Sequence, residues 1–264
     1  MSSQSTATPA HAVGTTGIIL VHPRYPENIG ASARIACNFG IDQLIVVSDE
    51  QYEKERMLKM ATHKAAHLIH TMKQVSTTRQ AAEPFHFIVA TTARQGKQRP
   101  AEQTPQQVMR ELAAFSAHGS QVALMFGPEN TGLKNEDVDL CQFTSTIPTA
   151  GFSSLNLAQA VGIHCYELFN ALPRTLPQHT SAQEYANSFD LEGMYEHIEE
   201  ALEGITFLHE TNKEYWMRSI RQFLSRIHLK KKEASMIRGI CRKFLWHASR
   251  EHRGTPSSQK GEDL

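Results

Sequence analysis

Three short segments of this chain combine small residues with polar side chains in patterns that suit ligand binding. Asn28 opens a run of small residues that ends at Arg34, residues 127–132 place Pro-Glu-Asn-Thr between two glycines, and Ser153–Asn156 reads Ser-Ser-Leu-Asn. Small polar side chains and free backbone N–H groups at a helix start can hold an anionic or polar ligand. Taken alone, the last segment favours an ordinary helix cap, and the ligand-binding interpretation rests on the three segments together.

The last of these segments is expected to open a helix. Asn156 is followed three residues later by Gln159, which is the spacing of a capping box. Beyond it, apolar positions recur with helical spacing. This stripe consists of Leu157, Ala160, Val161, His164, Cys165 and Leu168.

Upstream, short apolar runs alternate with helical patterns, and this alternation predicts an α/β domain with a mostly parallel sheet. In such sheets ligands bind beyond the carboxyl ends of the strands. Three small or polar loops, at 91–93, 127–132 and 147–155, follow such ends. The expected strands are Gly17–Val21, Leu44–Val47, Met72–Val75, Phe85–Ala90, Val122–Phe126 and Phe143–Ile147, with helices at Ile29–Phe39, Tyr52–His70, Thr77–Ala82, Thr104–Ala114 and Glu136–Leu140 between them.

The composition divides the chain into five parts. Residues 1–16 are expected to be a disordered tail, 17–172 the α/β domain, and 173–188 a linker rich in proline and polar residues. Residues 189–249 are expected to form a helical extension, and 250–264 a second disordered tail. The helices expected in the extension are Leu191–Leu208, Glu214–Arg226 and Glu233–His247.

The net charge of zero conceals an uneven distribution of charge. Residues 184–203 hold seven acidic and no basic residues, whereas residues 213–253 hold twelve basic and three acidic ones. The second stretch therefore carries a net charge of 12 − 3 = +9. Such a stretch is typical of a surface that faces phosphates, with a solvated helix face as the alternative.

Several function classes lack their sequence signals. No apolar run approaches the length of a membrane span, and the four cysteines form no Cys-x-x-Cys pair, so a cytoplasmic protein without a membrane partner is expected. There is no Gly-x-Gly-x-x-Gly, P-loop or Gly-x-Ser-x-Gly motif. No metal is expected, because His63, His67 and His70 have no further ligand at a suitable spacing and favour an ordinary helix surface.

Together, the three segments resemble the SPOUT class of RNA 2′-O-ribose methyltransferases, in its TrmH-like branch. Asn28–Arg34 gives Asn-x-Gly-Ala-x-Ala-Arg, Phe126–Leu133 gives Phe-Gly-x-Glu-x-x-Gly-Leu, and Ile147-Pro148 precedes Ser153–Leu157. The order of the motifs matches that of the family. The basic extension, with its Arg-x-x-Leu-x-Arg segment at residues 221–226, is similar to that of the TrmJ subgroup, whose members methylate the ribose at position 32 of the tRNA anticodon loop.

The resemblance implies an α/β knot, a homodimer, tRNA as substrate, and S-adenosyl-L-methionine as cofactor. It assigns catalytic roles to Asn28, Arg34 and Ser154. As a hypothesis, Arg34 binds a phosphate and stabilises negative charge on the attacking oxygen, while Ser154 or solvent helps to remove the proton. The cofactor-binding residues that it implies are Thr91, Thr92, Ala93, Gly127, Ile147, Ser153, Ser154 and Leu155.

Two alternatives stay open at this point. The catalytic motifs are shared with rRNA 2′-O-methyltransferases, and only the extension favours tRNA over rRNA. A non-catalytic RNA-binding protein with the same fold is the second alternative. The presence of Asn28, Arg34, Ser154 and Asn156 argues against it.

Overall fold

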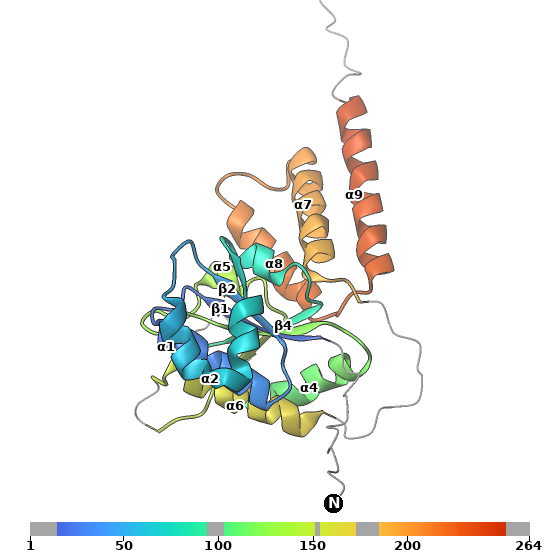
Figure 1. The fold of residues 1–264 in the computed structure, drawn as a ribbon. Helices are drawn as coiled ribbons and strands as arrows, with labels where there is room; N and C mark the ends of the chain where they lie inside the picture. The colour runs from blue at the N-terminus through green and yellow to red at the C-terminus, as the bar shows by residue number, and fades with distance from the viewer. Residues whose placement is uncertain (1–14, 94–102, 151–153, 173–184, 252–264) are drawn as a thin grey trace, which may run out of the picture. The chain divides into compact units, whose positions relative to one another are not determined.

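A computed structural model of the chain describes residues 15–93, 103–150, 154–172 and 185–251. The chain divides into two compact units, residues 1–184 and 185–264. The strands of the first unit are β1 (Thr16–Val21), β2 (Gln43–Val47), β3 (Lys73–Val75), β4 (Phe87–Thr91), β5 (Val122–Phe126) and β6 (Phe143–Ser145). All pair in parallel, in the order β3-β2-β1-β5-β4-β6 (Figure 1).

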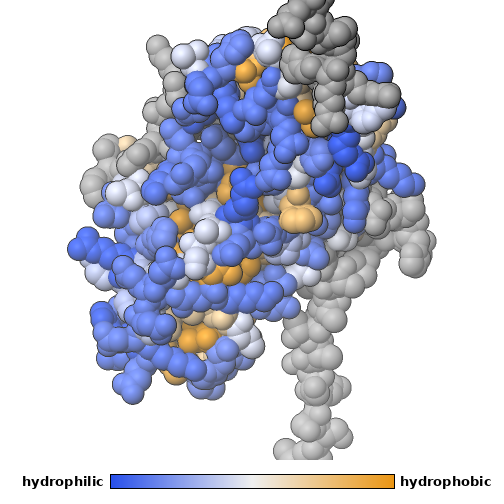
Figure 2. Space-filling view, turned by 90° about the horizontal axis from the view of Figure 1, so that it is seen from above, coloured by the Kyte–Doolittle hydropathy of each residue, from blue (hydrophilic) through white to orange (hydrophobic). Residues whose placement is uncertain are grey.

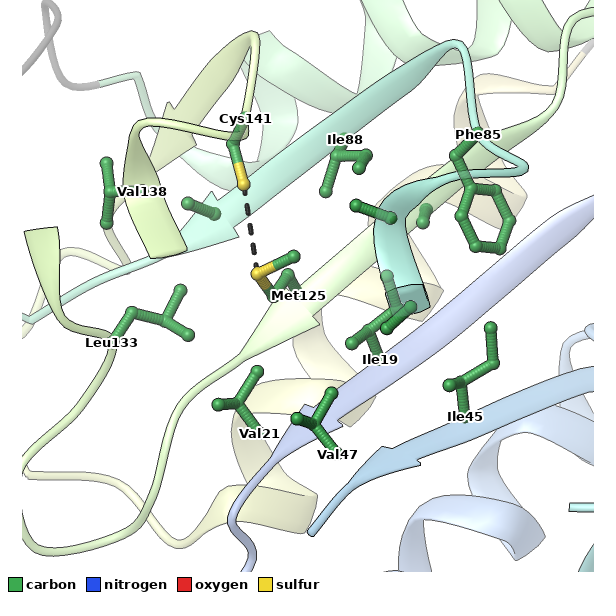
Figure 3. Close-up of a cluster of buried hydrophobic side chains, with 14 residues drawn as sticks. Ile19, Val21, Ile45, Val47, Phe85, Ile88, Met125, Leu133, Val138 and Cys141 are labelled. Carbon is green, nitrogen blue, oxygen red and sulfur yellow. Dashed lines mark hydrogen bonds between the residues drawn. The ribbon is translucent and has the colours of Figure 1, made fainter. Parts of the chain in front are cut away.

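Helices cover both faces of this sheet. They are α1 (Pro26–Asn38), α2 (Lys54–Thr71), α3 (Thr78–Ala82), α4 (Pro105–Ala117), α5 (Asn135–Val138) and α6 (Leu157–Ala171). On one face, α1 packs against α2 and α6, and α6 packs against α4 (Figure 1). On the other face, Ala82 of α3 and Val138 of α5 join the buried cluster that Figure 3 shows.

Burial on both faces explains the sequence pattern of the strands. Ile18, Ile19 and Leu20 of β1 are all fully buried, although successive side chains of a strand point to opposite faces. Ile19 belongs to the cluster of Figure 3, whereas Ile18 and Leu20 do not, as expected for side chains that alternate between the two faces of the sheet. A strand between two helical layers must be apolar at every position, which is why these strands read as short continuous hydrophobic runs.

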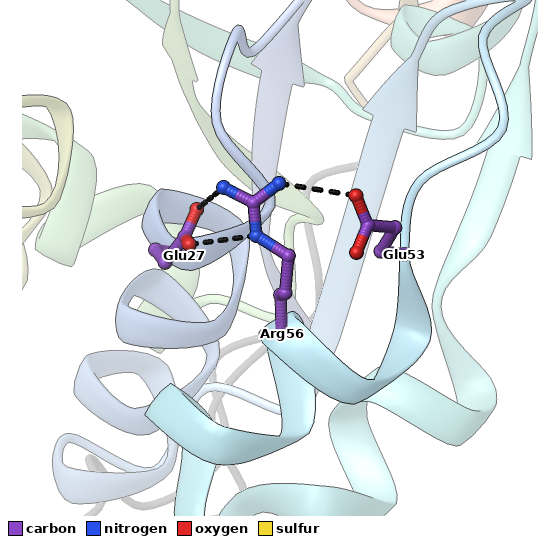
Figure 4. A network of polar contacts seen from close by, with 3 residues as sticks. All are labelled: Glu27, Glu53 and Arg56. Atoms are coloured by element: carbon purple, nitrogen blue, oxygen red, sulfur yellow. Dashed lines mark hydrogen bonds and ion pairs between the residues drawn. The ribbon is translucent and has the colours of Figure 1, made fainter.

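The position of α1 depends on close packing against α2. A Cβ atom added to Gly30 of α1 would lie 2.0 Å from the carbonyl oxygen of Met57, so only glycine fits at this crossing. Arg56 of α2 also binds Glu27 and Glu53 (Figure 4). These charged side chains are exposed, and solvent screens their attraction. We therefore attribute the orientation of α1 to the Gly30 contact rather than to the ion pairs.

The second unit consists of α7 (Ser188–Gly204), α8 (Lys213–Ser225) and α9 (Lys231–Glu251). Apolar side chains from all three helices, among them Met194, Met217 and Ala234, form its core. Arg221 of α8 forms a two-bond ion pair with Glu192 of α7, and Lys213 bonds to Glu199 and Glu203. The acidic and basic stretches of the sequence are therefore partly paired with each other inside this unit, and the basic stretch is less free than its net charge suggests.

The element bounds follow the sequence expectations closely, with small differences at the domain edges. β1 begins at Thr16, inside the range assigned to the N-terminal tail. The second unit begins at Tyr185, inside the range assigned to the linker, because Tyr185 pairs with Lys230 and Asn187 caps α7. α9 continues to Glu251, into the range assigned to the C-terminal tail. Residues 1–14, 173–184 and 252–264 lie outside the described residues.

The described surface is mixed in character. The face drawn in Figure 2 is mainly hydrophilic, with hydrophobic residues scattered over it. Within the described ranges, no helix is long and apolar enough to cross a membrane. In the same ranges, no three His, Cys, Asp or Glu side chains are grouped closely enough to hold a metal ion.

Candidate active site

A pocket of about 240 Å³ lies beyond the carboxyl ends of β4, β5 and β6. Residues of the loops that follow these strands line it, together with the start of α6. Seven of the eight residues predicted to bind the cofactor are among its lining, and the eighth, Ser153, lies outside the described residues. The seven are Thr91, Thr92, Ala93, Gly127, Ile147, Ser154 and Leu155.

The loop after β5 makes a tight turn that requires its two glycines. A Cβ atom added to Gly127 would lie 2.2 Å from the amide nitrogen of Leu133 and 2.4 Å from the carbonyl carbon of Gly132. Gly132 has φ +66°, a conformation that glycine adopts at little cost. Its N–H donates to the Pro128 carbonyl at 2.8 Å. The loop is therefore folded tightly back on itself at the edge of the pocket.

A hydrogen-bond network joins the three polar segments. Asn28 Nδ2 donates to Glu129 Oε1 at 2.6 Å, and Asn156 Nδ2 donates to Asn28 Oδ1 at 3.0 Å. The second carboxylate oxygen of Glu129 accepts the backbone N–H of Arg24 at 2.8 Å. Asn28 is buried, so each of its bonds replaces one that water would otherwise make. The network fixes the loops after β1 and β5 and the start of α6 relative to one another.

Replacing Glu129 tests how much this network contributes. We expect Glu129→Ala to lower the free energy of unfolding by about 1–3 kcal/mol, because the buried Asn28 amide loses its acceptor. Urea denaturation measures the change, with Glu83→Ala as the control because Glu83 is exposed and outside the pocket. An equal effect of the two substitutions would contradict a structural role for the network.

The start of α6 carries the capping box that the sequence predicted. The Asn156 side chain accepts from the backbone N–H of Ala158 at 2.9 Å, and Gln159 accepts from the Asn156 N–H at 3.2 Å. Asn156 therefore caps the helix with its oxygen and bonds to Asn28 with its nitrogen. Ser154 precedes this cap, is exposed and lines the pocket, so its hydroxyl is available to a ligand.

His164 of α6 and Ser145 of β6 form a buried polar pair in the pocket wall. His164 Nδ1 lies 2.8 Å from the Ala160 carbonyl, which only a protonated Nδ1 can satisfy, so Nε2 accepts from the Ser145 hydroxyl at 2.9 Å. Burial lowers the pKa of His164 from its ordinary value of 6.5 to about 4. The imidazole is therefore neutral at physiological pH and directs the Ser145 hydroxyl.

The low pKa of His164 predicts a pH-dependent stability. Because the unfolded chain binds a proton near pH 6.5 and the folded chain only near pH 4, the contribution of His164 is complete above pH 6.5 and is lost as the pH falls to 4. The expected loss is on the order of 3 kcal/mol. Denaturant titrations of the wild type and His164→Gln from pH 7 to 4 measure it. A stability difference between them that does not change with pH would contradict the assignment.

The predicted catalytic residues are only partly brought together. Ser154 lines the pocket. Asn28 does not line it but donates a hydrogen bond to Glu129, which does. Arg34 is exposed on α1 and is not among the residues that line this pocket. Within the described ranges its guanidinium has no hydrogen-bond or ion-pair partner.

Two features of the site were missed by the sequence interpretation. His164 was placed in the apolar stripe of its helix, which indicated its burial but not its contact with Ser145. The bond between Asn28 and Glu129 joins residues 101 positions apart, and nothing in the local sequence pattern signals it.

Comparison with known proteins identifies the family of the chain. Residues 15–166 match the model of the SpoU rRNA Methylase family. The chain belongs to this family. In this SpoU methylase, residues 189–254 match a second model, that of the C-terminal domain of the tRNA methyltransferase TrmJ. Membership implies the α/β knot that the sequence resemblance led us to expect, and the six parallel strands and the C-terminal helices agree with the expected fold.

Two curated relatives of this SpoU methylase are named as tRNA methyltransferases. The tRNA (cytidine/uridine/adenosine-2′-O-)-methyltransferase TrmJ of Pseudomonas aeruginosa is 29% identical over 84% of this chain and 91% of its own length. The tRNA (cytidine/uridine-2′-O-)-methyltransferase TrmJ of Sodalis glossinidius is 30% identical over 84% of this chain and 88% of its own. The crystal structure of TrmJ from Z. mobilis is 29% identical, covers 87% of this chain and 99% of its own, and superposes with a TM-score of 0.74.

Proposed function

We propose that this SpoU methylase transfers the methyl group of S-adenosyl-L-methionine to the ribose 2′-hydroxyl of a pyrimidine at position 32 of tRNA. The network of Glu129, Asn28 and Asn156 carries this proposal, because it joins all three motifs around one pocket. The likeness to TrmJ proteins over most of the chain supports tRNA as the substrate.

The pocket residues fit the proposed cofactor. Ile147, Leu155 and Leu157 offer apolar surface for a flat base, while Glu129 and Thr131 offer polar groups. When bound, S-adenosylmethionine supplies an electrophilic methyl group. The tight turn at Gly127 and the fixed start of α6 hold these walls in place before the ligand arrives, which lowers the cost of ordering on binding.

The chain must also position the ribose hydroxyl and accept its negative charge. We assign charge stabilisation to Arg34, because a guanidinium does not lose its proton in a protein and cannot act as a base. Its exposure leaves it able to bind a phosphate next to the reacting ribose. Ser154 is exposed at the pocket and assists removal of the hydroxyl proton directly or through solvent.

A homodimer through α1 and α6 is part of this proposal. Tyr166 and Phe169 of α6 are 54% and 46% exposed, and both rings contact Phe39 at the end of α1. An exposed aromatic cluster of this kind is typical of a protein interface. Arg34 lies on α1 and does not line the pocket of its own chain. A partner copy packed on this face would bring the same pocket of the partner close to Arg34.

A charged side chain placed in the proposed interface tests the dimer. We expect Phe169→Asp to convert a dimer into monomers in sedimentation velocity, because the interface would have to bury a carboxylate. Phe189→Asp is the matched control, since Phe189 is an exposed phenylalanine of the other unit. A wild-type chain that sediments as a monomer at micromolar concentration would contradict the proposal.

We assign tRNA capture to the second unit and place the enzyme in the cytoplasm. Three of its basic residues, Arg226, Arg242 and Lys243, are exposed. Basic side chains of this kind bind the phosphate backbone and make affinity strongly dependent on salt. The four cysteines are unpaired, as is usual in a reducing compartment.

Transfer of labelled methyl to total tRNA from a strain that lacks this modification tests the function. We expect label on a ribose at position 32, located by mapping the modified nucleotide. Label in rRNA but not in tRNA would retain the reaction and overturn the substrate. S-adenosylmethionine binding without label in either RNA would favour a non-catalytic RNA-binding protein.

A further inference from the structure

A second pocket, of about 260 Å³, adjoins the first at the same edge of the sheet. The two pockets share Pro128, Asn130 and Thr131, so one turn of the loop after β5 forms a wall of both. A molecule in the second pocket therefore lies next to a cofactor in the first. The other lining residues of the second pocket are His22, Pro23, Arg24, Ser48, Glu50 and Tyr52.

The walls of this second pocket are held by hydrogen bonds. Tyr52 donates its hydroxyl to the Pro23 carbonyl at 2.8 Å, and the Glu50 N–H donates to Ser48 Oγ at 3.0 Å. Gln74 Nε2 donates to the carbonyls of both Ser48 and Glu50 at 2.8 Å. The backbone on which Glu50 is mounted is therefore fixed from two directions.

The same pocket shows backbone strain. His22 has φ +44°, a conformation that is uncommon for residues other than glycine. Its N–H donates to the Val47 carbonyl at 2.9 Å, which ties the loop after β1 to the end of β2. Strained residues of this kind are concentrated at functional sites.

Two polar side chains of the pocket, in contrast to Tyr52 and Ser48, make no hydrogen bond to the part of the chain that the structure describes. Within the described residues, neither the Glu50 carboxylate nor the Asn130 side-chain amide has a hydrogen-bond partner. Within the same residues, the Arg24 guanidinium contacts only the Tyr25 ring, with Cζ lying 5.4 Å from the ring centroid. The pocket thus offers an acceptor, an amide that both donates and accepts, and a cation, all mounted on fixed backbone.

We propose that this second pocket binds the base of the target nucleotide and that Glu50 selects cytosine over uracil. The inference rests on the proposed function and names the nucleotide that the site prefers. A nucleotide whose base occupies the second pocket has its ribose at the shared wall, beside the cofactor pocket. Arg24 then lies where it can bind an adjoining phosphate.

The chemistry of the two pyrimidines explains the selection. A carboxylate accepts a hydrogen bond from the exocyclic amino group of cytosine. Uracil presents a carbonyl oxygen at the same position, which leaves the carboxylate without a donor and opposes it with partial negative charge. Asn130 fits either base, because its amide can donate to a carbonyl oxygen or to a ring nitrogen. Discrimination therefore falls to Glu50.

The experiment compares two full-length tRNA transcripts that differ only in C or U at the target position. Single-turnover methylation rates are measured for the wild type, Glu50→Gln and the control Glu83→Gln, which changes an exposed glutamate outside both pockets. We expect the wild type and the control to prefer cytidine by on the order of tenfold. Glu50→Gln should bring the two rates to within about twofold of each other. A glutamine amide can accept from the amino group of cytosine or donate to the carbonyl oxygen of uracil.

Each other outcome is decisive. A wild type that methylates both transcripts equally, or a Glu50→Gln variant that keeps the wild-type preference, would overturn the base-pocket assignment and leave the proposed function intact. A wild type that methylates neither transcript while S-adenosylmethionine binds would overturn the proposed function, and the assignment with it.

Discussion

Arg34→Ala is expected to slow methyl transfer in a single turnover by about 10²–10³-fold, because it removes a cation that stabilises developing negative charge in the transition state. Arg34 is exposed and has no partner within the described ranges, so its loss leaves no buried group unsatisfied. The melting temperature and the affinity for S-adenosylmethionine should therefore stay close to those of the wild type. Rapid-quench assays with saturating tRNA and cofactor measure the chemical step separately from binding.

The control for this experiment is Arg110→Ala. Arg110 is also an exposed helical arginine, but it lies on α4 and away from the pocket lining. It should retain the wild-type rate within about twofold. If Arg34→Ala retained that rate as well, the negative charge would have to be stabilised by other groups, and our assignment of Arg34 would be wrong.

Gly127→Ala is the second substitution with a large expected effect. Its added methyl group would lie 2.2 Å from the Leu133 nitrogen, so the loop after β5 must open. Since this loop forms a wall of the pocket, we expect the affinity for S-adenosylmethionine to fall by at least about 100-fold, which corresponds to about 2.7 kcal/mol. Isothermal titration calorimetry measures the affinity, and circular dichroism checks that the chain is folded.

Gly162→Ala provides the comparison, because it changes a glycine of the same unit that has room for a methyl group. A Cβ atom there would meet only the Ile35 side chain, at 3.6 Å. Alanine favours a helix over glycine by about 1 kcal/mol, so this variant should bind the cofactor normally and melt slightly higher. Equal cofactor affinities for the two variants would show that the tight turn at Gly127 is not needed for binding.

The amino-acid pattern predicted the parts of the molecule that depend on local interactions. Continuous apolar runs revealed strands that are buried on both faces, such as Ile18–Leu20 of β1. The spacing of Asn156 and Gln159 located the start of α6, because a capping box is made within four consecutive residues. Both signals depend on neighbouring residues, and both elements appear where they were expected.

Contacts between distant residues could not be predicted in this way. Glu129 bonds to Asn28 only because β1 and β5 are neighbours in the sheet, and no sequence period encodes that neighbourhood. The charge pattern of the C-terminal stretch was incomplete for the same reason. It suggested an open basic surface, whereas Arg221 and Lys213 are paired with carboxylates of α7. The pocket-lining residues were predicted from the resemblance to a known family, and the spacing of residue types alone would not have predicted them.

The way the first pocket is assembled links the stability of the first unit to cofactor binding. Its walls come from the ends of three strands and the start of α6, which lie far apart in the chain and meet only when the whole unit has folded. A ligand that binds only this completed form shifts the folding equilibrium toward it, by about 2.7 kcal/mol at a concentration 100 times its dissociation constant. The melting temperature of the chain is therefore expected to rise with the concentration of S-adenosylmethionine.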